Sequence, residues 1–247
     1  MAPWSHSKTE IALGTYEEIA LEYYDVRRHP TCANFREATR IALRRFIGRF
    51  GSEKQTICEV GAGRSILVEE LTRFHLHAEK ILLIDSSPSM LKYSERFREK
   101  RISRSEGDAT QLHLKSRSVE ILVSSLGDPY NTPSFWNEAY RILKPGGSIF
   151  YSTPSDDWAR AFRLQQGDAL AAAGFELRDG KLLSVPSLIC PVGEQVKLIE
   201  KSGLRLEEFQ DISIAALKNQ VLSPKLIIDR GAKASVVSCY TAVKPFG

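Results

Sequence analysis

The stretch Thr56-Ile-Cys-Glu-Val-Gly-Ala-Gly63 decides the fold that this sequence predicts. Its first five residues form a short apolar run typical of a buried strand, and its glycines mark a tight turn. A helix is predicted directly after this turn, over residues 65–74. Glycine lets the backbone approach a ligand closely, and a helix start offers free N–H groups. The stretch therefore predicts a strand–turn–helix unit with a ligand at the turn.

The same alternation continues along the chain. A strand over residues 81–84 ends in Asp85, and Ser87-Pro88 opens another helix, because serine caps helices well and proline is tolerated at the first helical position. Further elements are predicted over residues 119–123 (strand), 134–143 (helix), 144–147 (type II turn) and 148–151 (strand). Such alternation indicates right-handed βαβ units, and hence an α/β fold with a Rossmann-like, doubly wound, mostly parallel sheet covered on both faces.

The flanking segments predict a helical lid and a small insertion before the last strands. Tyr16, Ile19, Tyr23 and their neighbours recur at helical spacing until His29-Pro30 breaks the run, and a second helix follows over 35–50. Later elements are predicted over 156–173 (helix), 175–185 (hairpin), 193–201 (helix), 206–214 and 236–243 (strands). We expect one domain, divided into a lid (1–52), a cofactor-binding core (53–153), a substrate-side insertion (154–195) and a C-terminal helix with strands (196–247).

Length and composition agree with one domain. The chain has 247 residues, of which 43% are hydrophobic and 26% charged, as is ordinary for a globular protein. Its formal net charge of +4 permits an anionic partner without requiring one. No apolar run is long enough to span a bilayer, and the first residues do not read as a signal peptide, so a cytoplasmic location is expected.

The cysteines give no sign of a metal site. Cys32, Cys58, Cys190 and Cys239 lie far apart, and neither a CxxC pair nor a metal-ligand spacing with the five histidines occurs. We therefore expect reduced structural thiols and no bound metal.

Two residues beside the glycines narrow the ligand class. Asp85 follows the glycine turn by about 20 residues, the spacing at which an acid can accept both ribose hydroxyls of a nucleoside. A nicotinamide cofactor would need G-x-G-x-x-G, and the third glycine position is Ile66. S-adenosylmethionine (SAM) has no pyrophosphate and so needs no third glycine. Glu59, two residues before the first glycine, is typical of SAM-binding proteins.

Five segments in this order make residues 10–153 resemble the class I SAM-dependent methyltransferases, particularly the type 11 group. They are Tyr16-Glu-Glu-Ile-Ala-Leu-Glu-Tyr-Tyr-Asp25, Glu59-Val-Gly-Ala-Gly63, Leu83-Ile-Asp-Ser-Ser-Pro-Ser-Met-Leu91, Gly107-Asp-Ala109 and Arg141-Ile-Leu-Lys-Pro-Gly-Gly147. Ser65 stands where the family often has a third glycine. The resemblance implies that SAM is the cofactor and that its methyl group is transferred to an acceptor.

The resemblance also implies roles for individual residues. Asp85 would hold the ribose hydroxyls, Met90 would pack on the adenine, and Asp108 would accept from the adenine amino group. The other implied cofactor contacts are Tyr16, Tyr24, Glu59, Gly61, Ala62, Gly63, Ser86, Ala109, Ser125 and Leu126. Three of these residues have a second interpretation, because Asp108 could instead cap a turn, and Tyr16 and Tyr24 could belong to the core.

No motif identifies a catalytic group. Asp128 and Tyr130 belong to Asp128-Pro-Tyr130, which follows the strand over 119–123 and could face a substrate or form a plain turn. His29, near the lid, is a third candidate as a general base. Methyl transfer mainly requires that the nucleophile be held in line with the methyl group, so the reaction does not demand such a group.

The acceptor is expected to be a small molecule, and two alternatives remain. One is a tRNA or rRNA methyltransferase, since basic residues gather at Arg36, Arg40, Arg44 and Arg49 and again over residues 96–104. Either group could equally be a solvated helix face. The other alternative is a SAM-binding regulatory protein without catalysis. No membrane partner is expected, and the sequence does not indicate an oligomeric state.

Overall fold

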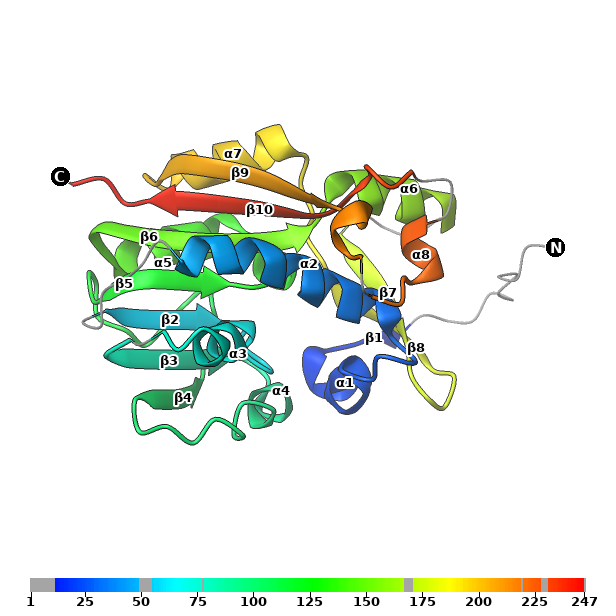
Figure 1. Ribbon diagram of the computed structural model, residues 1–247, viewed down its shortest axis with the longest axis horizontal. Helices are drawn as coiled ribbons and strands as arrows, with labels where there is room; N and C mark the ends of the chain where they lie inside the picture. The colour runs from blue at the N-terminus through cyan, green and yellow to red at the C-terminus, as the bar shows by residue number, and fades with distance from the viewer. Residues whose placement is uncertain are drawn as a thin grey trace.

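The architecture is a seven-stranded sheet with helices on both faces, described by a computed structural model for residues 12–48, 55–76, 78–166, 171–218, 220–227 and 231–246 (Figure 1). The strand order is β4-β3-β2-β5-β6-β10-β9. The bounds are β2 Thr56–Val60, β3 Lys80–Asp85, β4 Ile102–Glu106, β5 Val119–Ser124, β6 Leu143–Pro154, β9 Arg205–Ser213 and β10 Ser235–Val243. The predicted α/β fold is confirmed.

Five neighbouring strands, from β4 to β6, run parallel, and β10 is inserted antiparallel between β6 and β9. The parallel strands therefore all end at one edge of the sheet, and residues that follow them meet there. β2 and β3 are paired in a register that puts Val60 beside Ile84, so the glycine turn and Asp85 emerge side by side. The sheet is mostly parallel, as the sequence predicts.

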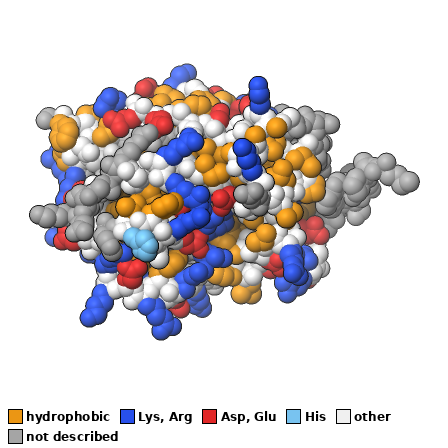
Figure 2. Space-filling model, viewed as in Figure 1, with side chains coloured by type: hydrophobic (Ala, Val, Ile, Leu, Met, Phe, Trp, Pro, Cys, Tyr) orange, Lys and Arg blue, Asp and Glu red, His pale blue; other side chains and the backbone are white. Residues whose placement is uncertain are grey.

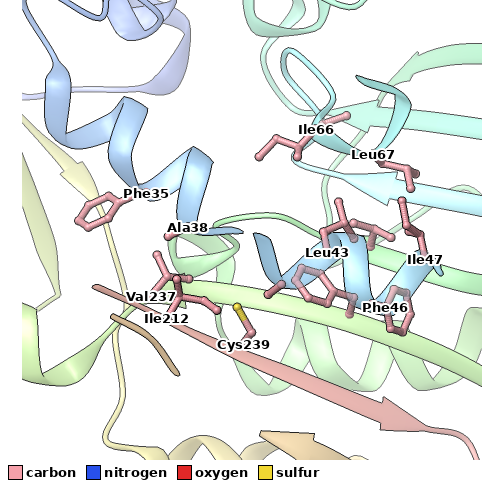
Figure 3. Close-up of a cluster of buried hydrophobic side chains, with 14 of the residues drawn as sticks. Phe35, Ala38, Leu43, Phe46, Ile47, Ile66, Leu67, Ile212, Val237 and Cys239 are labelled. Atoms are coloured by element: carbon pink, nitrogen blue, oxygen red, sulfur yellow. The ribbon is translucent and has the colours of Figure 1, made fainter. Parts of the chain in front are cut away.

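Two layers of helices bury the sheet. On one face lie α2 (Pro30–Ile47) and α3 (Ile66–Arg73), and on the other lie α5 (Pro133–Ile142) and α7 (Val192–Lys201). Figure 3 shows side chains of α2, among them Phe35, Ala38 and Phe46, gathered over Val237 and Cys239 of β10. Because both faces are covered, the central strands carry continuous apolar runs rather than alternating ones.

Local signals set the helix starts near the site. Ser65 caps α3 by accepting from the Val68 N–H, and Ser87 caps the short helix α4 (Pro88–Lys92) by accepting from the Met90 N–H. The Ser87 cap is where the sequence predicts it, and Ser65 caps the helix that was predicted to begin there. Pro30, expected to end the first helical run, occupies the first turn of α2, where its missing N–H costs nothing.

A second, three-stranded sheet lies beside the carboxyl edge of the large one. It consists of β1 (Ala12–Leu13), β8 (Leu182–Pro186) and β7 (Ala172–Glu176), with β1 parallel to β8. Helix α1 (Tyr16–Tyr23) covers it, and Ile19 packs with Phe175, Leu183 and Val185 (Figure 1). The predicted hairpin and the predicted lid thus form one apolar unit, which we call the roof.

Several predicted elements differ from the structure, among them the turn over 144–147 and the strand over 148–151, which both lie within β6. The helix predicted over 156–173 is α6, Asp156–Gln166, and Ala172 already belongs to strand β7. The strand predicted over 206–214 is β9, which ends at Ser213, and Ile214–Ala216 form a 3-10 turn. Strand β4 was not predicted, because the stretch before Gly107 reads as a loop. Arg49, His77 and the predicted end of the second helix near Phe50 lie outside the described residues.

Candidate functional site

The glycine turn after β2 forms the floor of a crevice at the carboxyl edge. Gly61 and Gly63 have φ angles of +61° and +42°, which only glycine adopts without strain. The Ala62 N–H donates to the Ile84 carbonyl at 3.0 Å, so the turn is tied to the end of β3. The turn predicted from the sequence is therefore present, and the hydroxyls of Tyr130 and Tyr24 lie against Gly61 and Gly63.

Asp85 links the turn to the segment that follows β3. Its Oδ2 accepts from the Gly63 N–H at 2.8 Å and its Oδ1 from the Ser87 N–H at 2.9 Å. Burial raises the pKa of Asp85, and the two N–H groups oppose this shift because they stabilise the carboxylate. Each carboxylate oxygen retains capacity to accept a further hydrogen bond.

Glu59 lies beneath the turn and is fully buried. Its Oε2 accepts from the Ser65 hydroxyl and its Oε1 from the Ser125 hydroxyl at 3.3 Å. Burial raises the pKa of Glu59 to about 7, so the group titrates near neutrality. Glu59 therefore connects the cap of α3 to the loop after β5.

Asp108 and Ala109 follow β4 at the same edge. Asp108 is exposed, and its Oδ1 accepts from the N–H of Thr110 at 2.7 Å and from its hydroxyl at 2.8 Å. Asp108 thus caps a turn, one of its two predicted interpretations, and also lines the crevice beside the buried Ala109. A single carboxylate can serve both purposes because it has two oxygens.

The crevice contains a cavity of about 430 Å³, enough for a nucleoside-sized ligand. One wall comes from the roof, one from the strand ends, and one from the loop after β5. The lining residues are Gly14, Thr15, Tyr16, Glu17, Gly61, Ser86, Ser87, Gly107, Asp108, Ala109, Pro129, Tyr130 and Pro186. Six of the predicted site residues are therefore brought together here: Tyr16, Gly61, Ser86, Asp108, Ala109 and Tyr130.

The other predicted cofactor residues surround this cavity without lining it. Met90 is buried in α4, and Leu126, after β5, has a φ of +58° and donates its N–H to Ser152 Oγ at 2.9 Å. Tyr24 reaches from the end of α1 to the glycine turn, where its hydroxyl accepts from the Arg64 N–H at 2.8 Å. The ring of Tyr24 packs edge-on against Tyr93. Tyr24 of the predicted lid thus contacts the glycine turn.

Asp128 is part of a buried polar chain behind the cavity. Its Oδ2 accepts from the Ser187 hydroxyl, whose oxygen accepts from Arg163 Nη2 at 2.6 Å. Burial raises the pKa of Asp128 to about 6, and the nearby Arg163 and the Ser187 hydroxyl oppose this shift. The chain connects the 3-10 turn Asp128–Tyr130 with the hairpin and with α6.

Tyr130 and His29, the other two catalytic candidates, lie in different places. The Tyr130 hydroxyl donates to the Val60 carbonyl at 2.9 Å, directly over Gly61. His29 stacks on Phe175 at a centroid distance of 4.0 Å, and its Nε2 lies 3.9 Å from Glu22 Oε2. Burial lowers the pKa of His29. His29 packs the roof and does not line the cavity.

Sequence reasoning missed the residues that join the roof to the crevice. Glu17 accepts hydrogen bonds from Ser87 and Ser89, and Pro186 reaches the cavity from the end of β8. Glu17 lies inside the quoted segment 16–25, so its position next to Tyr16 was the available signal. No sequence signal pointed to Pro186, because this residue reaches the cavity only when the hairpin is folded.

Two arginines of the basic stripe of α2, Arg40 and Arg44, are paired with acids, and Arg36 donates to the Arg64 carbonyl. Arg40 makes ion pairs with Glu37, Glu69 and Glu70, at 2.5, 2.6 and 2.9 Å. Arg44 pairs with Glu70 at 2.5 Å. Figure 2 shows basic and acidic side chains interleaved across this face.

In the second basic cluster, over residues 96–104, Arg104 donates to the Ser94 carbonyl at 2.6 Å. Much of the positive charge that could attract nucleic acid is thus balanced within the fold.

The described residues contain neither a membrane-spanning helix nor a metal-binding cluster. No helix there has the length and apolar character to cross a bilayer. Within the same ranges, no cluster of three or more His, Cys, Asp or Glu side chains is arranged to hold a metal ion. Cys32, Cys58, Cys190 and Cys239 are free thiols.

Comparison with known proteins agrees with this geometry. Residues 58–151 match the family model described as "Methyltransferase domain". No curated protein matches the chain in sequence. The resemblance seen in the sequence is confirmed by this match, which covers the glycine turn, Asp85 and Asp108.

Solved structures share the fold at low identity. The methyltransferase in a complex with the Trm112 methyltransferase activator from Haloferax volcanii is 17% identical, covers 94% of this chain and 96% of its own, and has a TM-score of 0.66. A SAM-dependent methyltransferase from Methanosarcina mazei is 14% identical, with 82% and 98% coverage and a TM-score of 0.61. Geranyl diphosphate C-methyltransferase from Streptomyces coelicolor, solved with S-adenosyl-L-homocysteine, is 12% identical, with 82% and 78% coverage and a TM-score of 0.59. The chain has the fold of class I SAM-dependent methyltransferases.

Proposed function

We propose that the protein is a SAM-dependent methyltransferase that transfers a methyl group to a small molecule by in-line displacement. The observation that carries the proposal is that Gly61 and Asp108 line one cavity beneath a roof, while Asp85 lies buried next to two residues of the lining, Ser86 and Ser87, and accepts from the Gly63 N–H of the glycine turn. Open α/β sheets bind ligands at this edge, and a buried carboxylate at the end of the strand next to a glycine turn suits a ribose. Carboxylates also favour a cationic cofactor over an anionic one.

The residues present fit SAM. Asp85 has free acceptor capacity for ribose hydroxyls, and Ser86 and Ala109 line the place next to it. At Gly61 an added Cβ would lie 2.5 Å from the Tyr130 hydroxyl, so this surface has no room for a larger residue. Met90 and Asp108 would hold the adenine, and Ser125 and Leu126 the sulfonium end. When bound, SAM supplies a methyl group on a positively charged sulfur.

The protein's own part in the reaction is to hold the acceptor in line and exclude water. Tyr16, Pro129 and Pro186 form the cavity wall between the roof and the loop after β5. Orientation of this kind lowers a barrier by about 7–11 kcal/mol. Asp128 is the best placed of the candidate proton acceptors, since burial raises its pKa to about 6 and it adjoins Tyr130 of the wall. His29 belongs to the packing of the roof.

A small-molecule acceptor is favoured over RNA. Residues of α1 and of the end of β8 form part of the lining of the cavity. Among the described residues that line it none is Lys, Arg or His. The paired arginines of α2 are a further reason, since phosphate binding would have to compete with Glu69 and Glu70.

The remaining parts of the proposal concern organisation. The lid, core, insertion and C-terminal segment divide the chain at about residues 52, 153 and 195, with the lid and hairpin acting together. The Haloferax neighbour was solved with an activator protein, so a partner subunit is a second possibility to be tested by the activity of the chain alone. The four free thiols favour a cytoplasmic location.

Two measurements test the proposal. Purified protein is titrated with S-adenosyl-L-homocysteine in a calorimeter, and saturable 1:1 binding is expected. The protein is then incubated with methyl-labelled SAM and either a small-molecule cell extract or total RNA. Label in the extract supports the proposal, and label in RNA supports the RNA alternative. Binding without transfer to either pool supports the regulatory alternative, and absence of binding contradicts the assignment of the site.

A further inference from the structure

Glu17 joins the two walls of the proposed cofactor cavity. It lies in the first turn of α1, and its Oε2 accepts from the Ser87 hydroxyl at 2.5 Å and from the Ser89 N–H at 3.1 Å. Its Oε1 accepts from the Ser89 hydroxyl. Both oxygens of one carboxylate are therefore used to hold α1 against the segment that follows Asp85.

This contact is not needed to form helix α1. The helix is capped by Thr15 and Glu18, whose side chains each accept from the backbone N–H of the other, at 2.8 and 3.4 Å. Glu17 takes no part in that capping box and is exposed to solvent. The printed contacts of the Glu17 side chain therefore link α1 to Ser87 and Ser89, and none of them stabilises the helix itself.

The contact leads directly to the residue proposed to hold the ribose. The Ser87 N–H donates to Asp85 Oδ1 at 2.9 Å, and the Ser87 hydroxyl donates to Glu17. One serine thus touches both the buried carboxylate of the floor and the carboxylate of the roof. Glu17 and Ser87 also line the cavity, on opposite walls.

Two other contacts hold the far end of α1. The Tyr93 hydroxyl donates to the Ala20 carbonyl at 2.8 Å, and the Tyr24 hydroxyl accepts from the Arg64 N–H at 2.8 Å. Neither Ala20 nor Tyr93 lines the cavity, so these contacts act as a support away from the opening. Glu17 is the roof residue whose release would separate the cavity walls at Ser87.

We propose that the carboxylate of Glu17 is a latch, which closes α1 over the cofactor cavity through Ser87 and Ser89 and so sets how fast an adenosyl ligand leaves. This inference rests on the proposed function. Glu17 is a positioning residue, because it holds the roof and takes no part in the transfer. The hydroxyls of Ser87 and Ser89 lower the pKa of Glu17, so the latch is ionised at neutral pH.

The test measures dissociation of S-adenosyl-L-homocysteine by stopped flow, with excess unlabelled ligand as a trap. Glu17→Ala removes all three acceptor contacts and Glu17→Gln keeps one acceptor oxygen. We expect Glu17→Ala to raise the dissociation rate about tenfold and Glu17→Gln to raise it less, with association changed by less than about threefold. Ser89→Ala, which removes one partner, is expected to fall between the wild type and Glu17→Ala.

Glu18→Gln is the matched control, because it changes a neighbouring glutamate of the same helix while preserving the capping box. Its dissociation rate is expected to stay within about twofold of the wild type. A structural defect would lower the urea midpoint of Glu17→Ala, whereas a latch leaves that midpoint unchanged. A wild-type dissociation rate in folded Glu17→Ala overturns the latch and leaves the proposed function intact. Failure of the wild type to bind S-adenosyl-L-homocysteine overturns the proposed function itself.

Discussion

The hydroxyl of Tyr130 lies directly over Gly61 and donates to the carbonyl of Val60 at 2.9 Å. An ideal Cβ on Gly61 would be 2.5 Å from that hydroxyl and 3.0 Å from the ring. Two independent constraints therefore favour glycine at position 61. Its φ of +61° strains any residue with a Cβ, and the Tyr130 phenol leaves no space for that atom. A ligand that lies on the Gly61 surface must displace the phenol, so the two residues are expected to be coupled in stability and in binding.

Gly61→Ala is predicted to lower the free energy of unfolding by about 2 kcal/mol or more, since the left-handed backbone alone costs about 1–2 kcal/mol for a residue with a Cβ. Tyr130→Phe removes the closest atom. In a double-mutant cycle by urea denaturation, we expect Gly61→Ala to cost at least about 0.5 kcal/mol less in the Tyr130→Phe background. Strict additivity would show that the phenol and the turn are independent.

Asp85→Asn is predicted to weaken binding of S-adenosyl-L-homocysteine by about 2 kcal/mol, or roughly 30-fold, because a charge-assisted pair of hydrogen bonds to the ribose becomes neutral. Calorimetry measures the change. Glu106→Gln is the matched control, since Glu106 ends the neighbouring strand β4, is exposed and does not line the cavity. Equal affinities of wild type and a folded Asp85→Asn protein would refute the ribose contact.

Glu59 is predicted to make stability depend on pH. Its pKa is about 7 when folded and is near 4.5 when unfolded, so the folded state binds more protons between these values. Stability attributable to this group is therefore present below pH 4.5 and is lost as pH rises to 7, by about 3 kcal/mol at 1.36 kcal/mol per unit of pKa shift. Glu59→Gln should flatten this slope in urea denaturation at pH 5, 6, 7 and 8. Parallel curves for the two proteins would show that Glu59 is ionised in the fold.

Arg163→Leu is predicted to destabilise the protein by about 3 kcal/mol at pH 7.5, because it leaves the Asp128 carboxylate buried without its compensating charge. The loss should be smaller at pH 5, where Asp128, with a pKa of about 6, is protonated in the fold. Arg160→Leu is the control on the same helix, since Arg160 is half-exposed and pairs with Asp156 at the surface. A cost for Arg163→Leu no greater than that for Arg160→Leu would contradict the buried chain.

The parts of the fold that the sequence predicts are those with strong local signals. The apolar runs of β2, β3 and β5 and the caps Ser65 and Ser87 each favour one structure, and the parallel arrangement follows from their alternation. Strand β4 was missed because only Ile102 in it is buried, and the remainder, Ser-Arg-Ser-Glu, reads as polar loop. β4 is an edge strand of the sheet and buries little apolar surface, so its sequence lacks the apolar pattern by which strands are predicted.

The boundary between α6 and β7 shows the limit of local propensity. Ala172 and Ala173 favour a helix, yet they pair with Pro186 and Val185 of β8. The hairpin is held by the burial of Phe175 and Leu183 against α1, a contact between segments over 150 residues apart. Such tertiary contacts override the alanines, and no window of the sequence contains them.

The same distinction applies to the site. Gly61, Asp85 and Asp108 follow strands, so their meeting at one edge could be predicted from topology. Glu17 contacts the segment after β3, and the Arg163–Ser187–Asp128 chain joins α6, the end of the hairpin and the loop after β5, so both depend on tertiary contacts. The sequence therefore predicts the residues at the strand ends, but of the roof residues that line the cavity it predicts only Tyr16.

The pairing of β1 with β8 has a consequence for biosynthesis. Leu13 is made early and its partner Ser184 more than two thirds of the way along the chain. A nascent chain that has completed the glycine turn, Asp85 and Asp108 thus has these strand ends but no roof over them. β1 can pair with β8 only after the hairpin has been synthesised, so the roof is assembled after the strand ends that it covers.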